Sequence, residues 1–492
     1  MSKLLKAILP VGLPLLLIFQ FFNNSPAQEI NAEITVPAGG QSSAAVSGRF
    51  NGPRSSRRRN LWFLKSFAGY DRLGERFSAL AVTDAQGHPV SVRQLIPGEF
   101  LADGDLQNWN YTVDLSPPKM GEAAAHVSWI AADRGLIFLD DVLPQTGAGT
   151  RATVEFVLPP GWEIVTTERK TGDNKFEVTN AEKAVFVIGR GFRDVRSPNK
   201  GLHMLVSGDR QFSDGEAVSM ANEIYDGYKK TFRIEPSVNV QIALMRFPGA
   251  AGPGIWEADT RGSSVTVLSS DMPFKTQSLQ RLHEQLRHEI FHLWIPNGVN
   301  LSGSYDWFYE GFALYLSLKN GVLMNRIRFD DFLDTLSRAY MIDRSQKPRL
   351  SLIEASKNRS SVGNTTVYAR GLITAFLCDL VLLRNSKGKM DASNIAADLF
   401  DRYHSQPAAV DGNDAVFGVM QKYPGLSRLV ENYVKGNAAI DWTSDLAPAG
   451  IVAGEQNSVT VLKTLERPTG RQREMLDKLG YNSWQKLTDS SK

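Results

Sequence analysis

One short stretch constrains this chain more than any other. His288-Glu289-Ile290-Phe291-His292 places two histidines four positions apart, and Glu310 stands just before an apolar run from Gly311 to Leu318. On an α-helix, residues i and i+4 lie one turn apart on the same face, so both imidazoles can bind one metal ion. Catalytic zinc takes three protein ligands and keeps a fourth position open, and Glu310 fits the role of third ligand. The pattern predicts two helices facing each other across one Zn²⁺ per chain.

The apolar spacing around the motif also indicates a helix. One apolar stripe along the predicted helix consists of Leu279, Leu282, Leu286, Ile290 and Leu293. The two histidines project roughly opposite that stripe, so both sides of the helix are expected to be covered. Glu289 follows the first histidine and can serve as a general base without ligating the metal. The alternative is a chance occurrence of the five-residue pattern, and the presence of Glu310 argues against it.

These residues resemble the gluzincin peptidases, in which two helix histidines and a downstream glutamate hold zinc. The sequence from His288 to Trp294, followed by Trp307 to Phe312, is similar to the glycyl aminopeptidase family and, more distantly, to the aminopeptidase N family. The likeness is strongest at Arg287 to Leu316 and extends over Glu29 to Gly454. It implies an α+β multidomain protein, with an N-terminal all-β sandwich-like domain, a thermolysin-like catalytic domain and a C-terminal helical domain.

Two further phrases carry the resemblance and imply site residues. Tyr368-Ala369-Arg370-Gly371 opens an apolar helix and resembles the Tyr-x-x-Gly phrase whose tyrosine stabilises the reaction oxyanion in these peptidases. Gly254-Ile255-Trp256-Glu257-Ala258, in a glycine-rich loop, looks like a divergent form of the Gly-x-x-Glu signature that binds the free amino group of the substrate. A packing role for Tyr368 and a structural turn at Glu257 are the plainer alternatives. Ala258 stands where relatives usually have Asn or His, which puts strict exopeptidase activity in doubt.

The pattern along the chain predicts a strand-rich first part. With 492 residues, of which 42% are hydrophobic, the chain can form about three domains with a large core. Residues 28–205 are expected to form the N-terminal β domain, because short strand-like segments alternate with Gly and Pro clusters. We expect a hairpin at Ser78 to Val92 and further strands at Ala123 to Ala131 and at Thr153 to Leu158.

The remaining chain changes to a mixed and then a helical pattern. Residues 206–325 are predicted to form the zinc catalytic domain, with strands at Val238 to Phe247 and Ser264 to Leu268. The second strand either accepts the substrate backbone as an added strand or is an ordinary sheet strand. Residues 326–454 are expected to be a helical domain. The tail at 455–492 is expected to add a strand and a short helix, and it is too short for the PDZ domain that follows in many relatives.

The N-terminus has the pattern of a secretory signal peptide at residues 1–27. Lys3 and Lys6 precede an apolar run from Ala7 to Phe22, and cleavage is expected after Ala27. The alternative is an uncleaved anchor, although the run is short of the about 20 residues that a membrane span needs. We therefore expect a bacterial protein that is exported, periplasmic or secreted, with no stable membrane association once the signal is cleaved. Cys378 is the only cysteine, and its apolar surroundings predict a core residue.

The net charge of the chain does not indicate a strongly charged partner. The formal net charge is +3, so nothing predicts binding to nucleic acid. The basic run from Arg54 to Arg59 is interpreted as a solvated loop rather than a site for a phosphate or a lipid headgroup. The expected partner is a peptide or protein substrate.

The sequence thus predicts an exported zinc-dependent peptidase, and the resemblance makes it an aminopeptidase. The assigned roles are zinc ligands for His288, His292 and Glu310, general base for Glu289, oxyanion donor for Tyr368 and substrate binding for Glu257. Three alternatives stay open: an inactive homologue with structural zinc that acts as a binding protein, a zinc endopeptidase, and a metal-dependent hydrolase of a non-peptide substrate. Structural zinc is normally closed by four protein ligands, whereas three are found here.

Overall fold

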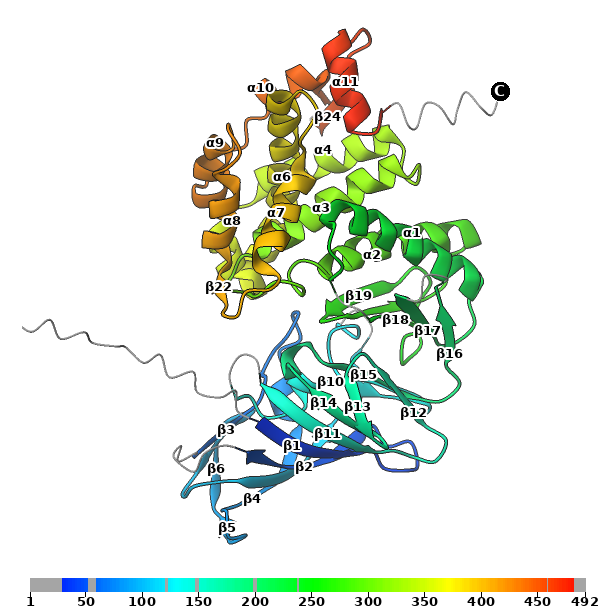
Figure 1. Cartoon of the computed structure of the whole chain (residues 1–492), viewed down its shortest axis with the longest axis vertical. Helices are drawn as coiled ribbons and strands as arrows, with labels where there is room; N and C mark the ends of the chain where they lie inside the picture. The colour runs from blue at the N-terminus through cyan, green and yellow to red at the C-terminus, as the bar shows by residue number, and fades with distance from the viewer. Residues whose placement is uncertain are drawn as a thin grey trace, which may run out of the picture.

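A computed structural model of the chain describes residues 29–51, 59–119, 123–146, 150–197, 201–236, 239–457 and 459–481. The expected signal sequence and the basic residues Arg54, Arg57 and Arg58 lie outside these residues. Strands gather at the N-terminal end of the molecule and helices at the other end (Figure 1). The architecture is therefore α+β and multidomain, as the sequence predicted.

The N-terminal part contains three sheets in the described residues. The largest has eight strands in the order β13 (Arg169–Gly172), β14 (Lys175–Val178), β11 (Arg151–Val157), β1 (Glu29–Thr35), β2 (Ser43–Asn51), β8 (Asn108–Asp114), β4 (Phe77–Thr83) and β5 (Pro89–Val90). The second has four: β12 (Glu163–Thr166), β15 (Val185–Gly189), β10 (Arg134–Phe138) and β9 (Trp129–Ile130). The third has three: β3 (Asn60–Trp62), β7 (Glu99–Ala102) and β6 (Val92–Ile96). The pairing of β4 with β5 confirms the predicted hairpin, and β11 confirms the strand predicted at Thr153 to Leu158.

A five-stranded mixed sheet follows in the chain. Its order is β16 (Arg193–Arg196), β17 (Leu202–Val206), β18 (Val240–Met245), β20 (Ser264–Ser269) and β19 (Trp256–Arg261). The strands β17, β18 and β20 are parallel, and β19 is antiparallel to β20 at the edge. Of the two alternatives for the Ser264 to Leu268 strand, the structure shows the ordinary sheet strand, because both of its edges are already paired. In the described residues, the outer edges of β16 and β19 are unpaired, and β19 is the one next to the Ser264 to Leu268 strand.

The eight-stranded sheet, the four-stranded sheet, the five-stranded sheet and the helices form four stacked layers. Successive side chains of a strand point to opposite faces. On β18, Ile242 and Leu244 pack with the helices, whereas Ala243 and Met245 pack against the four-stranded sheet. On β15, Val187 faces the five-stranded sheet and its neighbours in the strand face the eight-stranded sheet. The five-stranded sheet is thus covered on both faces, and every residue of β18 and β20 is buried.

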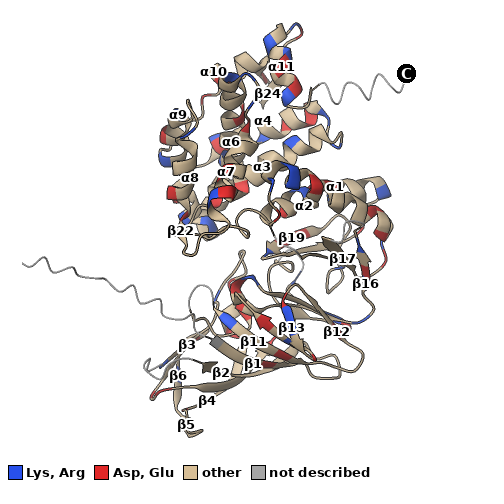
Figure 2. Ribbon diagram, in the orientation of Figure 1, with Lys and Arg blue, Asp and Glu red and all other residues tan. Residues whose placement is uncertain are grey.

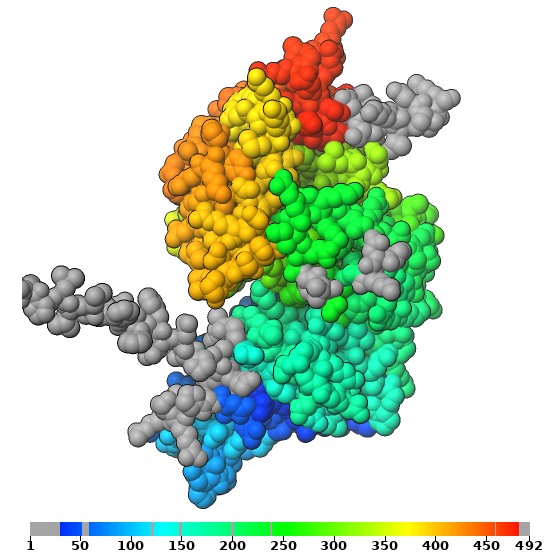
Figure 3. Space-filling model, viewed as in Figure 1, coloured from blue at the N-terminus to red at the C-terminus, as the bar shows by residue number. Residues whose placement is uncertain are grey.

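The helices cover the far face of this sheet and form the C-terminal part. They are α1 (Asp214–Phe232), α2 (Lys275–His292), α3 (Asp306–Leu323), α4 (Phe329–Ser345), α5 (Leu352–Lys357), α6 (Asn364–Ser386), α7 (Ala392–Tyr403), α8 (Gly412–Met420), α9 (Ser427–Leu429), α10 (Thr443–Leu446) and α11 (Gly470–Lys478). In the space-filling view, the green segment that includes α1 and α2 lies between the blue-to-cyan strands and the orange-to-red helices (Figure 3). Residues of both charge signs are interspersed over helices and strands (Figure 2).

Short elements complete the described chain. Two-residue strands β21 (Leu301–Ser302) and β22 (Val410–Asp411) pair in parallel, and β23 (Ile451–Gln456) pairs with β24 (Val459–Thr464). Short 3₁₀ helices are η1 (Leu73–Arg76), η2 (Leu139–Asp141), η3 (Ala181–Lys183) and η6 (Ala447–Ala449), and short π-helical segments are η4 (Arg359–Gly363) and η5 (Val430–Lys435). Within the tail at 455–492, β24 and α11 confirm the expected strand and short helix.

Two sequence predictions about the N-terminal half are wrong in part. The segment Ala123 to Ala131 was predicted as a strand, but only β9 is extended, and residues 124–126 form a turn. That turn contacts β19, because the backbone N–H of Ala125 donates to Glu257 and Arg261 donates to the carbonyl of His126. Glu257 itself was predicted in a loop, yet it lies on β19, where pairing with β20 extends the backbone.

Helix α6 is the central helix of the C-terminal part. The segment Arg359–Ser386 is long and apolar enough to cross a membrane, but 94% of its most apolar window is buried inside the protein. It packs against α3 and α4 as a core helix does. Cys378, on this helix, is fully buried, which confirms its prediction as a core residue.

Helices α3 and α6 approach each other most closely at a pair of glycines. A β-carbon on Gly311 would lie 2.6 Å from the carbonyl carbon of Gly371, and one on Gly371 would lie 2.9 Å from the carbonyl oxygen of Trp307. Both distances are shorter than van der Waals contact, so neither position accommodates a side chain without movement of a helix backbone. The glycine pair therefore sets the separation between the helix that carries Glu310 and the helix that carries Tyr368.

We predict that Gly371→Ala lowers the free energy of unfolding by about 1–3 kcal/mol, the usual cost of overpacking a core. Gly418→Ala is the matched control, because Gly418 lies inside α8 and the nearest atom to its added β-carbon is Arg402 Nη1 at 4.0 Å. That variant should gain up to about 1 kcal/mol from helix propensity. Urea denaturation followed by circular dichroism measures both, and equal stabilities would contradict the close helix contact.

Candidate metal centre

Helix α2 presents two imidazoles to the same point. The Nε2 atoms of His288 and His292 lie 3.1 Å apart. The other ring nitrogen of His292, Nδ1, lies 2.9 Å from the carbonyl oxygen of Ile295, to which it donates in the neutral ring. That hydrogen bond leaves Nε2 as the unprotonated, metal-binding nitrogen. The stripe predicted for this helix is confirmed, since Leu282, Leu286, Ile290 and Leu293 are buried on the opposite side.

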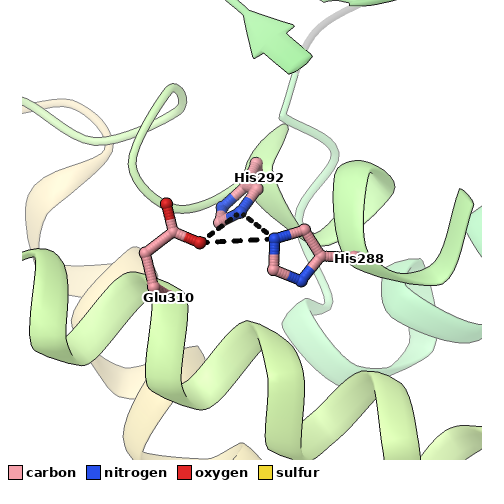
Figure 4. A group of neighbouring side chains, drawn as sticks. All are labelled: His288, His292 and Glu310. Carbon is pink, nitrogen blue, oxygen red and sulfur yellow. Dashed lines mark hydrogen bonds and ion pairs between the residues drawn. The ribbon is translucent and has the colours of Figure 1, made fainter. Parts of the chain in front are cut away.

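Glu310 reaches the two imidazoles from α3 (Figure 4). Its Oε2 lies 3.3 Å from His288 Nε2 and 3.6 Å from His292 Nε2. This oxygen is buried and has no hydrogen-bond partner among the described residues, whereas Oε1 accepts a hydrogen bond from Arg359. Burial alone would raise the pKa of Glu310, but the two histidines and the charge of Arg359 bring it well below its ordinary value. The group is therefore an ionised carboxylate, as a metal ligand must be.

The donor set fits a divalent zinc ion. One ligand atom from each of His288, His292 and Glu310 lies within 4.8 Å of the others. Two imidazole nitrogens and one carboxylate oxygen are the ligand types of catalytic zinc sites with an open fourth position. The unpartnered carboxylate oxygen is the further indication, because a buried anion needs a cation or a donor. The three residues that the sequence assigned to zinc are thus brought together.

Glu289 lies beside these ligands with its carboxylate held by a strand. The hydroxyl of Thr260, on β19, donates to Glu289 Oε2 at 2.7 Å. Burial raises the pKa of Glu289. A buried carboxylate with a raised pKa is a stronger proton acceptor than one in water. Its geometry suits a base next to the metal.

Tyr368 lies in the second turn of α6, since the helix begins at Asn364 and not at the tyrosine as predicted. Its hydroxyl oxygen accepts a hydrogen bond of 2.7 Å from Arg359. Burial and the carboxylate of Glu310 raise the pKa of Tyr368, so the phenol keeps its proton. Tyr368, His288 and Glu289 all line one cavity of about 820 Å³, which extends between α2, α3 and α4. Tyr368 therefore borders the same space as Glu289.

Glu257 lies apart from the cluster, on the edge strand β19. Its Oε2 accepts a hydrogen bond of 3.0 Å from the backbone N–H of Ala125. Its Oε1 is buried and has no hydrogen-bond partner among the described residues. One oxygen thus joins β19 to the N-terminal part, and the other is left for a donor. Its contact with substrate stays a prediction.

Sequence reasoning missed the residues that hold the predicted ones. Thr260 orients Glu289, and it lies three residues after Glu257 in a stretch that was examined only for its glutamate. Arg359 contacts both Glu310 and Tyr368 from η4, a short segment without helical periodicity that gave no signal. Tyr309 belongs to the stretch Trp307 to Phe312 around Glu310, Asp306 immediately precedes that stretch, and both contact Arg359.

No protein-family model and no curated protein matches this chain. Solved structures do match. An aminopeptidase N family protein from Idiomarina loihiensis has a TM-score of 0.71 and 16% identity, over 90% of this chain and 82% of that one. An M1 zinc metallopeptidase from Deinococcus radiodurans, a glutamate-to-alanine mutant bound to a Tyr-Ser-Ala substrate, has a TM-score of 0.55 and 14% identity, over 84% and 95% of the two chains. A two-domain M1 zinc metallopeptidase mutant bound to L-arginine has a TM-score of 0.53 and 15% identity, over 84% and 95%.

These likenesses show that the chain has the fold of the M1 zinc metallopeptidases. The α+β class expected from the sequence is confirmed, and so is the broader likeness to the aminopeptidase N family at the level of the fold. The closer resemblance to the glycyl aminopeptidase family stays a prediction, because the matching structures carry other family names.

We predict that Glu310→Gln lowers zinc affinity by more than the about 10–100-fold typical of changes outside the ligand shell. The neutral amide lacks the negative charge with which the Glu310 carboxylate would balance the divalent cation. Zinc content after dialysis against a competing chelator, measured by inductively coupled plasma mass spectrometry, tests this. His88→Gln is the control, because the His88 side chain is 77% exposed on a distant hairpin. Stoichiometric zinc in Glu310→Gln would exclude Glu310 as a ligand.

Proposed function

We propose that this chain is an exported zinc-dependent peptidase that acts as an aminopeptidase. One observation carries the proposal: His288, His292 and the unpartnered oxygen of Glu310 converge beside a buried Glu289, within the fold of the M1 zinc metallopeptidases. Export is proposed from the signal pattern at residues 1–27 alone. Peptides or proteins are the proposed substrates.

Zinc would be held by His288, His292 and Glu310, one ion per chain. When bound there, it supplies a Lewis acid that polarises a peptide carbonyl and makes water more acidic. The three ligands arise from two helices that are fixed in the core, so the site needs no rearrangement of the backbone to accept the ion. A binding protein with structural zinc would normally close the site with a fourth ligand, and the described residues provide three.

Glu289 takes a proton from the attacking water and returns it to the leaving amine. The hydrogen bond from Thr260 to Oε2 fixes the carboxylate and leaves Oε1 as the proton acceptor. Burial raises the pKa of Glu289, which strengthens it as a base. Protonated Glu289 can then act as the acid in the second half of the reaction.

Tyr368 stabilises the oxyanion. Its oxygen already accepts a hydrogen bond from Arg359, so its own hydrogen is the group that remains to be donated. A donor in a buried site, aimed where negative charge develops, is worth about 10²–10³ in rate. The cavity of about 820 Å³ beyond His288 and Tyr368 gives room for the leaving part of the peptide.

The aminopeptidase assignment rests on β19. Its outer edge is unpaired in the described structure, so a peptide can add to it as a strand. Glu257 lies on this strand with one oxygen that lacks a partner, and an ammonium group would satisfy it through a charge-assisted hydrogen bond. Ala258 and the hydrogen bond that Glu257 accepts from Ala125 favour the alternative of an endopeptidase, in which Glu257 is structural.

We expect Glu289→Gln to keep stoichiometric zinc while turnover of a peptide substrate falls by about 10²–10⁴. The amide oxygen can still accept the bond from Thr260, but it cannot take a proton. Zinc analysis and a continuous peptidase assay measure the two effects. Glu431→Gln, an exposed change on η5, is the control that should retain full turnover. Undiminished hydrolysis by Glu289→Gln would remove the base from the proposal.

A second experiment compares peptides with free and N-acetylated amino termini. An aminopeptidase should show a much higher kcat/KM for the free peptides, and Glu257→Gln should lower that value by about 10–100-fold, the loss of one charged hydrogen bond. The same variant should leave the small activity on acetylated peptides unchanged. Equal cleavage of both peptide series by the wild-type chain would instead assign an endopeptidase.

A further inference from the structure

Arg359 is the residue through which the metal ligand and the tyrosine are connected. Its Nη2 donates to Glu310 Oε1 at 2.8 Å and to the hydroxyl oxygen of Tyr368 at 2.7 Å. Its Nη1 donates to Asp306 Oδ1 at 2.8 Å, and the hydroxyl of Tyr309 donates to the same Asp306 oxygen at 2.7 Å. One guanidinium group therefore contacts side chains of both α3 and α6.

The setting of Arg359 favours a fixed orientation. It begins η4, the segment that joins α5 to α6, and its side chain is 30% exposed, whereas Asp306 and Glu310 are 15% and 9% exposed. Two carboxylates flank the cation, so its charge is compensated from both sides. The planar guanidinium offers donors in fixed directions, which a flexible ammonium group lacks. The hydrogen-bond network thus restricts both the arginine and its partners.

We infer that Arg359 is a positioning residue that orients Glu310 and Tyr368 together. A carboxylate on a two-carbon side chain can rotate, and the bond to Oε1 leaves Oε2 directed at the two imidazoles. The bond from Arg359 is accepted by the phenol oxygen, so the tyrosine hydrogen is not used for it, and Tyr368 borders the same cavity as Glu289 and His288. Groups that hold ligands from behind typically contribute about 10–100-fold to metal affinity or activity.

The inference deepens the proposed function, and only its kinetic part rests on that function. The part that concerns Glu310 predicts the affinity for zinc, which needs no substrate. The part that concerns Tyr368 predicts kcat, because a misplaced oxyanion donor weakens binding of the transition state more than binding of the substrate.

The first experiment measures the zinc dissociation constant by chelator competition in Arg359→Met and Arg359→Lys. We expect an increase of about 10–100-fold for the methionine variant and a smaller increase for lysine, which keeps the charge but loses the fork. Arg402→Met is the matched control, since Arg402 lies over the ring of Tyr403 as Arg359 lies over the ring of Tyr368, but it contacts no metal ligand among the described residues. The lysine variant decides the test if the methionine variant fails to fold. Zinc affinity equal to that of the wild type in a folded variant overturns the inference.

The second experiment is a double-mutant cycle on kcat with Tyr368→Phe, performed at saturating zinc. Arg359→Met should lower kcat by at least about 10-fold with little change in KM, and it should have a smaller effect when Tyr368 is already replaced. Its effect on the zinc dissociation constant should be the same in both backgrounds. Additive effects on kcat would overturn the role of Arg359 toward Tyr368. A purely structural role would instead lower the melting temperature and leave the zinc constant unchanged.

Discussion

The buried carboxylate of Glu310 is the group on which the arrangement of the site depends. The Glu310 side chain is buried, and a carboxylate removed from water is costly unless cations and donors surround it. Arg359 supplies a charged donor at one oxygen, and the two imidazoles face the other. A divalent ion would complete the compensation at that second oxygen. Helix α3, which carries Glu310, must therefore lie at a fixed distance from α2.

The stacked sheets supply the rigid support for that distance. Helix α2 packs on a five-stranded sheet whose other face is covered by the four-stranded sheet, so both faces are buried in continuous apolar layers. The edge strand β19 belongs to the same sheet, and its Thr260 holds Glu289 while its Glu257 contacts the N-terminal part. Thr260, which holds Glu289, and the unpaired edge of the sheet thus belong to one strand. The contacts of β19 thus connect the N-terminal β-rich part to helix α2.

Local pattern was enough to predict the cluster of candidate metal ligands, because His288 and His292 lie one helical turn apart and Glu310 precedes the next apolar run. Contacts between residues far apart in the sequence could not be predicted from local pattern. Arg359 meets Glu310 across 49 positions of sequence, in a segment with no periodicity. The order of β20 and β19 also escaped prediction, since an apolar segment gives no sign of which neighbours it pairs with. The prediction of a strand at Ala123 to Ala131 was wrong in part, because the apolar residues at its start are buried within a turn and not within a sheet.

The phrase Tyr-Ala-Arg-Gly shows how one short segment serves both geometry and chemistry. Gly371 lies three positions after Tyr368, almost one turn along the same side of α6. Because Gly371 contacts Gly311, the residue next to Glu310, the helix crossing brings the phenol and the metal ligand to the same level. A side chain at either glycine would separate the helices and lengthen both bonds of Arg359. The glycine pair sets the distance, and the arginine then sets the orientation that catalysis requires.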